Sequence, residues 1–264
     1  MTQIQRKWLS VAVCAALAGT FGLSPRIWSA GLQLHADLDH AQPSLTDIVV
    51  RMVAYRQWQD DYLREYQARR KFHASNPRFK MDSTLEVRTI FRWPYSLEST
   101  VLTQEGSSFI RAHVFEKILA AETEQASKDQ ADIIPKNYDF SLLGQGECDG
   151  RRSWHLTMNP KRKDKYLFEG KLWIDVDDYA VVRIEGHPAK KLSFWIERAD
   201  FVRQYQKIDR FWLPDKDETF VQVRLYGKKV LTINHQDYVV NGAQHNEEPS
   251  PDREFRTVGS VFPN

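Results

Sequence analysis

The sequence predicts an α+β fold in which a half-open, strongly curved antiparallel β-sheet, an incomplete barrel, has helices covering its concave face. Two observations lead to this prediction. Residues 140–240 contain short alternating segments joined by tight turns, which is the pattern of an antiparallel meander. Residues 45–69 instead repeat their apolar side chains at helical spacing. A meander this long must curl, and its concave side offers the helix a place to bury its apolar face.

The N-terminal helix has a clear start signal. Ser44 is a typical N-cap residue, and Asp47 follows three positions later, as in a capping box. Apolar residues from Leu45 to Tyr66 then recur near a 3.6-residue period and give the helix a broad apolar face. We expect the helix to run from about 45 to 69. Four arginines are expected largely on its solvent side: Arg56, Arg64, Arg69 and Arg70.

The strands are predicted from alternation and from turn residues. After Pro77 the apolar period changes to two, and Asp149-Gly150 and Gly227-Lys228 mark two hairpin turns. The predicted strands are 85–91, 96–103, 108–115, 142–148, 153–158, 171–176, 180–185, 191–207, 217–226 and 229–240. The Ala-, Glu- and Lys-rich residues 115–130 favour a second helix between them.

The first thirty residues have the composition of an export signal. Arg6 and Lys7 precede an apolar run that reaches Leu23, and small residues follow at Ser29-Ala30. We expect residues 1–30 to be a signal peptide, 31–43 a polar tail, 44–242 a single β-rich domain and 243–264 a polar C-terminal tail. A retained N-terminal anchor is the alternative to cleavage. The predicted location is the periplasm or an equivalent compartment.

Charge and cysteine content narrow the class of protein. Removing residues 1–30 leaves 34 basic against 35 acidic residues, so bulk charge does not favour a nucleic-acid partner. Of the two cysteines, only Cys148 lies beyond the signal, which excludes an internal disulfide in the mature chain. Lipidation at Cys14 is disfavoured because Val13, a branched residue, stands where a small one is expected.

No catalytic motif is present. The sequence lacks a G-x-S-x-G elbow, a P-loop, a dinucleotide fingerprint, an H-E-x-x-H motif and paired Cys motifs. His35, Asp37, Asp39 and His40 can be read as a metal cluster, but a solvated tail is the simpler interpretation. The acidic residues of 175–178 resemble a calcium loop, yet the required Gly is missing, and a hairpin turn is favoured. We expect no catalytic residue, no metal and no cofactor.

One motif resembles a known family. Residues 170–175 (GKLWID), a turn, and residues 181–185 (VVRIE) are similar to the central hairpin of periplasmic lipoprotein-sorting and lipoprotein-carrier proteins, the LolA/LolB-like group with the RseB-type sensors as structural cousins. Residues 210–214 (RFWLP) match the strand that follows it. The resemblance covers about 170–240 well. In this group a basic residue near the first strands handles cargo, and Arg88 and Arg92 are the nearest counterparts.

The resemblance implies an unclosed barrel around a hydrophobic cavity that holds lipid or lipoprotein acyl chains. We therefore expect a non-enzymatic periplasmic carrier or sensor that binds lipid or acylated lipoprotein, with a possible inner- or outer-membrane protein partner. The first alternative is a periplasmic interaction module with a filled core that assists an envelope complex. A hydrolase is the second alternative. The basic loop at 160–165 is either a contact for anionic headgroups or a plain solvated loop.

Alternation along the strands predicts which residues line the cavity. Apolar side chains of the later strands are expected on one face, with counterparts early in the sheet and on the first helix. The predicted ligand-binding residues are Val49, Met52, Val53, Leu85, Val87, Phe91, Leu172, Ile174, Val182, Ile184, Leu192, Phe194, Ile196, Val221, Val223 and Leu225. The aliphatic residues among them serve equally well as ordinary core.

Overall fold

A computed structural model gives the fold of the central part of the chain. It describes residues 42–93, 96–124, 132–164, 166–190, 194–225 and 227–242. The predicted signal peptide, nearly all of the 31–43 tail with its His/Asp cluster, and the predicted C-terminal tail lie outside the described residues.

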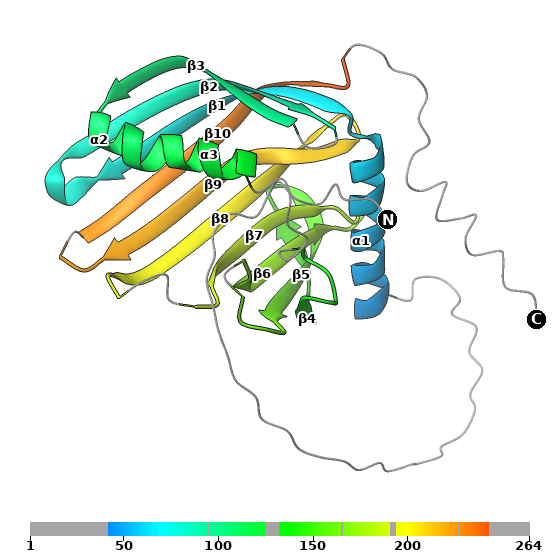
Figure 1. The fold of residues 1–264 in the computed structure, drawn as a ribbon. Coiled ribbons are helices and arrows are strands. Elements are labelled where there is room, and N and C mark those ends of the chain that lie inside the picture. Colours follow the sequence, from blue (N-terminus) through cyan, green and yellow to red (C-terminus); the bar gives the residue numbers. More distant parts are fainter. Residues whose placement is uncertain are drawn as a thin grey trace, which may run out of the picture.

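The described strands form one antiparallel sheet of ten strands in the order β3-β2-β1-β10-β9-β8-β7-β6-β5-β4 (Figure 1). The strands are β1 Glu65–Asn76, β2 Met81–Arg92, β3 Ser96–Gly106, β4 Tyr138–Cys148, β5 Arg151–Pro160, β6 Phe168–Asp175, β7 Val181–Pro188, β8 Ile196–Ile208, β9 Phe211–Val223 and β10 Gly227–Val240. The edge strands β3 and β4 do not pair in this order, so the curved sheet stays open. The predicted fold class is confirmed.

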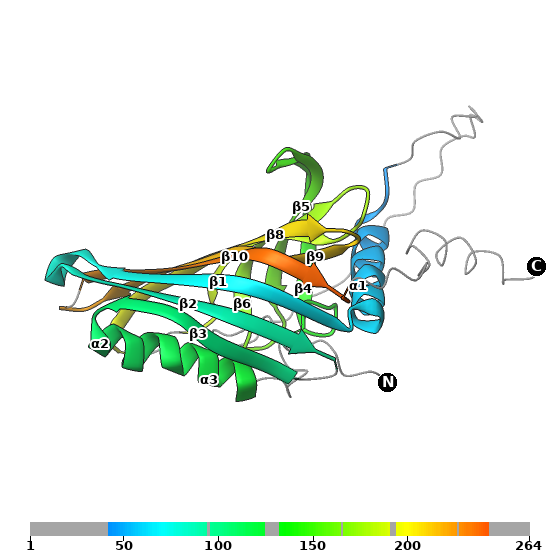
Figure 2. The same ribbon diagram turned by 90° about the horizontal axis from the view of Figure 1, so that it is seen from above.

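Two helical segments cover the same face of this sheet. Helix α1 (Leu45–Tyr62) crosses one end of it, beside β4 to β7. The second segment consists of α2 (Ser108–Ile110), the π-helical turn η2 (Arg111–Phe115) and α3 (Glu116–Glu124), and it lies over β1 to β3 (Figures 1 and 2). A single 3₁₀ turn, η1 (Pro77–Phe79), joins β1 to β2. Among the described residues, no helix is both long and apolar enough to span a membrane.

The predicted extent of the first helix was wrong at its C-terminal end. Leu63 is already extended, and β1 begins at Glu65. The residues that follow alternate in burial and pair with both β2 and β10, and these pairings outweigh the apolar spacing that predicted further helix. Arg70 is consequently buried in β1 rather than solvated on a helix, whereas Arg64 and Arg69 are exposed and Arg56 is half-buried.

Two predicted strands differ from the structure. Residues 108–115 are helical, because Ser107 accepts a hydrogen bond from the backbone N–H of Ile110 and starts α2. The strand predicted over 191–207 begins only at Ile196. The second helix is confirmed as α3, which ends at Glu124, and residues 125–131 lie outside the described residues. The other strands agree with the prediction within a few residues at most ends, although β1 was missed and β9 begins six residues early, at Phe211.

Three apolar clusters fill the space between the sheet and its helices. The first joins Ile48, Val49 and Met52 of α1 to β5, β6 and β7. The second surrounds the end of α1, where Trp58 stacks on Phe211 at a centroid distance of 5.5 Å. The third lies beneath η2 and α3. The sheet therefore has two helical covers over separate parts of one concave face.

Candidate functional site

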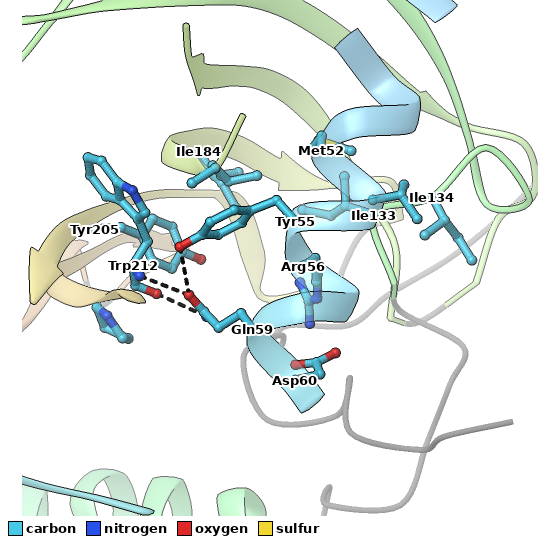
Figure 3. A pocket seen from close by; sticks show the side chains of 14 residues that line it. Met52, Tyr55, Arg56, Gln59, Asp60, Ile133, Ile134, Ile184, Tyr205 and Trp212 are labelled. Atoms are coloured by element: carbon cyan, nitrogen blue, oxygen red, sulfur yellow. Dashed lines mark hydrogen bonds between the residues drawn. The ribbon is translucent and has the colours of Figure 1, made fainter. Parts of the chain in front are cut away.

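A small cavity lies beneath α1, between the helix and strands β7, β8 and β9. Its volume is about 70 Å³. Aliphatic side chains and three aromatic ones make most of its wall, and Arg56 and Asp60 are its charged members (Figure 3). The lining residues are Met52, Val53, Tyr55, Arg56, Gln59, Asp60, Ile133, Ile134, Ala180, Val181, Ile184, Tyr205, Trp212 and Pro214.

The sequence of α1 determines which of its side chains line the cavity. Ser44 caps the helix with Asp47 in the predicted capping box, which fixes where the helical period begins. Met52, Tyr55 and Gln59 then follow at spacings of three and four and point to the sheet. The start of α1 thus determines which side chains reach the cavity.

Neutral hydrogen bonds hold α1 against β9. The Gln59 side chain accepts from the Trp212 backbone N–H at 2.8 Å and donates to the Trp212 carbonyl at 3.1 Å. The Tyr55 hydroxyl donates to the Arg210 carbonyl at 2.9 Å and also lies 3.3 Å from Gln59 Oε1, the contact drawn in Figure 3. Burial raises the pKa of Tyr55, so its hydroxyl stays protonated and remains a donor. These bonds pair polar groups that would otherwise be costly to bury.

The cavity is suited to binding an apolar group. Burial also raises the pKa of Tyr205, so the aromatic wall is uncharged at neutral pH. Within the described residues no cluster of His, Cys, Asp and Glu has the arrangement of a metal site. Apart from Arg56 and Asp60, the wall combines apolar side chains with a few neutral polar groups, and such walls favour hydrocarbon over a charged substrate.

The predicted lining residues are distributed over several places. Val49, Met52, Val53, Leu172, Ile174 and Ile184 gather in the cluster beneath α1, and Met52, Val53 and Ile184 reach the cavity itself. Val182 and Phe91 belong to the second cluster, and Leu85 and Val87 lie beneath α3. Ile196, Val221 and Val223 are half-buried.

Two predicted lining residues are on the surface instead. Phe194 and Leu225 expose 71% and 73% of their area, because both stand in turns outside the strands where alternation no longer applies. Leu192 lies outside the described residues. The sixteen predicted residues therefore do not form one continuous lining.

The sequence analysis missed the polar and aromatic part of the cavity. Tyr55 was counted only as an apolar helical position, and Gln59 has the appearance of an ordinary solvated residue. Trp212 lies in the segment that resembles the sorting family, and this was the available signal. Ile133 and Ile134 precede β4 in an irregular segment, so no periodicity marks them.

A second polar feature crosses the middle of the concave face. Arg70 of β1 forms a bidentate ion pair with Glu122 of α3, at 2.8 and 2.7 Å. Beside it, His235 of β10 contacts Asp217 of β9 at 3.1 Å, and Arg203 of β8 lies 3.3 Å from the same carboxylate. The two cationic counterparts suggested from the sequence, Arg88 and Arg92, are exposed. The basic residue inside the fold is Arg70.

Arg70 and Asp217 keep their charges in this buried setting, whereas His235 does not. Burial opposes the charge of Arg70, but Glu122 holds the pKa of the guanidinium above its ordinary value. Burial likewise opposes the charge of Asp217, yet His235 and Arg203 hold its pKa below the usual range. Burial lowers the pKa of His235 despite the hydrogen bond with Asp217, which leaves this imidazole neutral.

The acidic residues of the β6–β7 hairpin form a turn, as the sequence favoured. Asp175 Oδ1 accepts the backbone N–H groups of Asp177 and Asp178, and Arg151 pairs with Asp175 Oδ2 at 2.6 Å. The predicted basic loop lies between β5 and β6, where Lys161 pairs with Asp139 at 3.3 Å.

Comparison with known proteins finds likeness in structure only. No family model and no curated protein matches this chain. A LolA superfamily protein from Nitrosomonas europaea is 10% identical, with a TM-score of 0.41, over 81% of this chain and 98% of that chain. A candidate outer membrane lipoprotein-sorting protein domain from Vibrio parahaemolyticus is 13% identical, with a TM-score of 0.41, over 78% of this chain and 97% of that chain.

A third structure is a DUF1329 family protein from Desulfovibrio piger. It is 14% identical, with a TM-score of 0.42, over 75% of this chain and 92% of that chain. Two of these three names, those of the Nitrosomonas and Vibrio proteins, are names of the group that the sequence resembles. With identities and TM-scores this low, the likeness carries no argument about ligand or partner.

Proposed function

We propose that the protein is an exported, non-enzymatic binding protein of the periplasm, and that it takes an apolar chain of a lipid or acylated lipoprotein into the cavity beneath α1. One observation carries the proposal. The interface between α1 and the sheet contains a cavity that joins a largely apolar wall to a cover held by neutral hydrogen bonds. Each methylene moved from water into such a wall contributes about 0.8 kcal/mol.

The size of the cavity requires that α1 moves when a chain binds. Ligand pockets commonly measure about 300–1,000 Å³, whereas this one measures about 70 Å³. The three hydrogen bonds from Tyr55 and Gln59 are the contacts that must open. Each neutral hydrogen bond contributes only about 0.5–1.5 kcal/mol net, so binding of several methylenes offsets their loss.

A pair of substitutions on α1 tests the proposal. Val53 lines the cavity, and Val50 on the same helix is exposed. We expect Val53→Phe to fill the cavity, to keep or raise the melting temperature, and to weaken binding of a fluorescent fatty acid about tenfold or more, a loss of at least 1.4 kcal/mol. Val50→Phe makes the same change outside the cavity and should bind like the wild type. Equal affinities for the two variants contradict the proposed site.

The second candidate function is a protein-interaction module that assists an envelope complex at the inner or outer membrane. The three filled apolar clusters favour it, because they leave little empty space in this conformation. Native mass spectrometry of the protein purified without detergent separates the two candidates. Co-purified lipid that Val53→Phe removes supports the carrier. A ligand-free mass, together with no uptake of fatty acid, supports the interaction module.

A further inference from the structure

The end of the sheet away from α1 gathers three turns of the chain (Figures 1 and 2). They are the β1–β2 turn at 77–80, residues 194–196 at the start of β8, and residues 224, 225 and 227 of the β9–β10 turn. The strand register joins the last two, since Val223 pairs with Ile196 on one side and with Gly227 on the other, and Ser75, just before the first turn, pairs with Val230 of β10. The Arg224 backbone N–H also donates to the Trp195 carbonyl at 2.8 Å. We call these three turns the tip surface.

The tip surface exposes large apolar side chains from each of its turns. Phe79 is 48% exposed, Phe194 71%, Trp195 54% and Leu225 73%. Leu225 also has a φ of +65°, a conformation in which bulky residues are rare. Neither packing nor backbone preference explains a leucine at this position. A gathering of exposed apolar residues on one protruding end of a domain indicates a binding surface.

Basic residues surround these apolar side chains. Residues 77–80, 187–190, 194–198, 224–225 and 227–229 contain seven Lys or Arg and one acidic residue, Glu197. This charge is local, because the predicted mature chain has almost equal numbers of basic and acidic residues. Arg224 lies over the Phe194 ring at 4.5 Å, so a cation and an aromatic ring are presented together. The complementary surface must therefore be anionic and must accept protruding apolar groups.

We propose that the tip surface docks the protein on an anionic phospholipid bilayer. Aromatic and leucine side chains enter the headgroup layer, while Lys and Arg contact the phosphates around them. A bilayer fits better than a protein pocket, because the apolar groups come from three separate convex turns and not from one flat patch. This proposal does not rest on the ligand proposed for the cavity.

Co-sedimentation of the full chain with vesicles tests the proposal. We expect binding to vesicles of phosphatidylcholine with phosphatidylglycerol, weaker binding to phosphatidylcholine alone, and a loss at raised salt. Lys228→Glu with Lys229→Glu should weaken binding to the anionic vesicles by about tenfold or more. Phe194→Ser with Trp195→Ser should cause a loss of similar size.

Matched controls lie at the α1 end of the molecule. Arg51→Glu with Arg64→Glu removes the same amount of charge there, and Val50→Ser with Trp93→Ser removes exposed apolar area. All these positions are exposed, and circular dichroism confirms that each variant folds. Tip variants that bind like the control variants overturn the proposal, as does a wild-type chain that ignores anionic vesicles. If the N-terminal apolar run bound the vesicles instead, the tip and control variants would bind equally, because all of them contain that run.

Quenching of tryptophan fluorescence by brominated lipid locates the contact. Trp195 is the tip tryptophan, and we expect Trp195→Phe to remove most of the quenching that the wild type shows while binding persists. Quenching that survives in Trp195→Phe overturns the proposed orientation. If the chain sediments only when a co-purified protein is present, whether or not vesicles are added, a bilayer is not its partner.

Discussion

Helices α1 and α3 cover the same concave face, but the interfaces beneath them differ in kind. Beneath η2 and α3, Phe115 packs edge-on against Phe72 at a centroid distance of 5.7 Å. The bidentate Arg70–Glu122 ion pair joins α3 to β1 at the edge of this interface. Beneath α1 a cavity remains, and the helix is joined to β9 by neutral hydrogen bonds. A buried ion pair is costly to break, whereas neutral bonds are not. The comparison indicates that α3 is a fixed part of the fold and α1 is the cover that can open.

The largest expected effect is on the α3 side. Arg70→Met removes the buried cation of this pair and leaves the half-buried Glu122 unpaired beneath α3, and we expect the free energy of unfolding to fall by about 3–5 kcal/mol. Arg69→Met on the opposite face of the same strand removes exposed pairs with Glu86 and Asp237 and should cost less than about 1 kcal/mol. Urea unfolding measures both. Similar losses for the two variants contradict a locking role for Arg70.

The next largest expected effect is a difference in stability loss when an apolar residue is truncated beneath α3 or beneath α1. Phe115 is fully buried, and Phe115→Ala is expected to cost about 3–5 kcal/mol because it opens a new cavity. Val53 already borders a cavity and is half-buried, so Val53→Ala should cost only about 1 kcal/mol. Thermal unfolding of the two variants provides the measurement. If Val53→Ala is as damaging as Phe115→Ala, the space beneath α1 is closely packed and the comparison fails.

A smaller effect tests the attachment of α1 alone. Gln59→Ala removes two hydrogen bonds to Trp212 and should lower the free energy of unfolding by about 1–2 kcal/mol. Hydrogen exchange should show faster opening of the α1 amides, with no change in α3. Gln57→Ala on the same helix removes a bond within the helix to Asp61 and serves as the control. Faster exchange in both helices would mean that the covers open together.

The smallest expected effect is pH dependence from His235. Burial lowers its pKa from 6.5 in the folded protein, so the unfolded chain binds the proton more readily. Stability should therefore be full above the unfolded value and fall as the pH drops below 6.5, by at most about 1.4 kcal/mol per pH unit for one proton. His235→Gln should flatten this dependence. Asp217 contributes in a separate, more acidic range, because its pKa lies below 3.8.

The parts of the fold that were predictable depend on local patterns. Alternation and an Asp-Gly or Gly-Lys turn within a few residues are enough to find the β4–β5 and β9–β10 hairpins. Residues 65–69 were assigned to the first helix because Tyr66 continues the helical spacing, and residues 70–76 were assigned to no element; pairing with β2 and with the distant β10 makes the whole segment a strand. At the cavity, Met52, Val53 and Ile184 were predictable as apolar positions. Gln59 was not, because its partner, the Trp212 backbone, lies 153 residues away.

The pairing of β1 with β10 has a consequence for how the chain folds. Asn241 accepts the backbone N–H of Arg64, 177 residues earlier, and donates to the Tyr62 carbonyl. The last strand of the described chain thus joins β1, β2 and β3 to the rest of the sheet, and β1 has a neighbour on one side only, β2, until β10 arrives. Contacts so distant in sequence require costly loop closure and make folding slow. The nascent domain therefore keeps an unpaired strand edge at β1 until its final residues have been made.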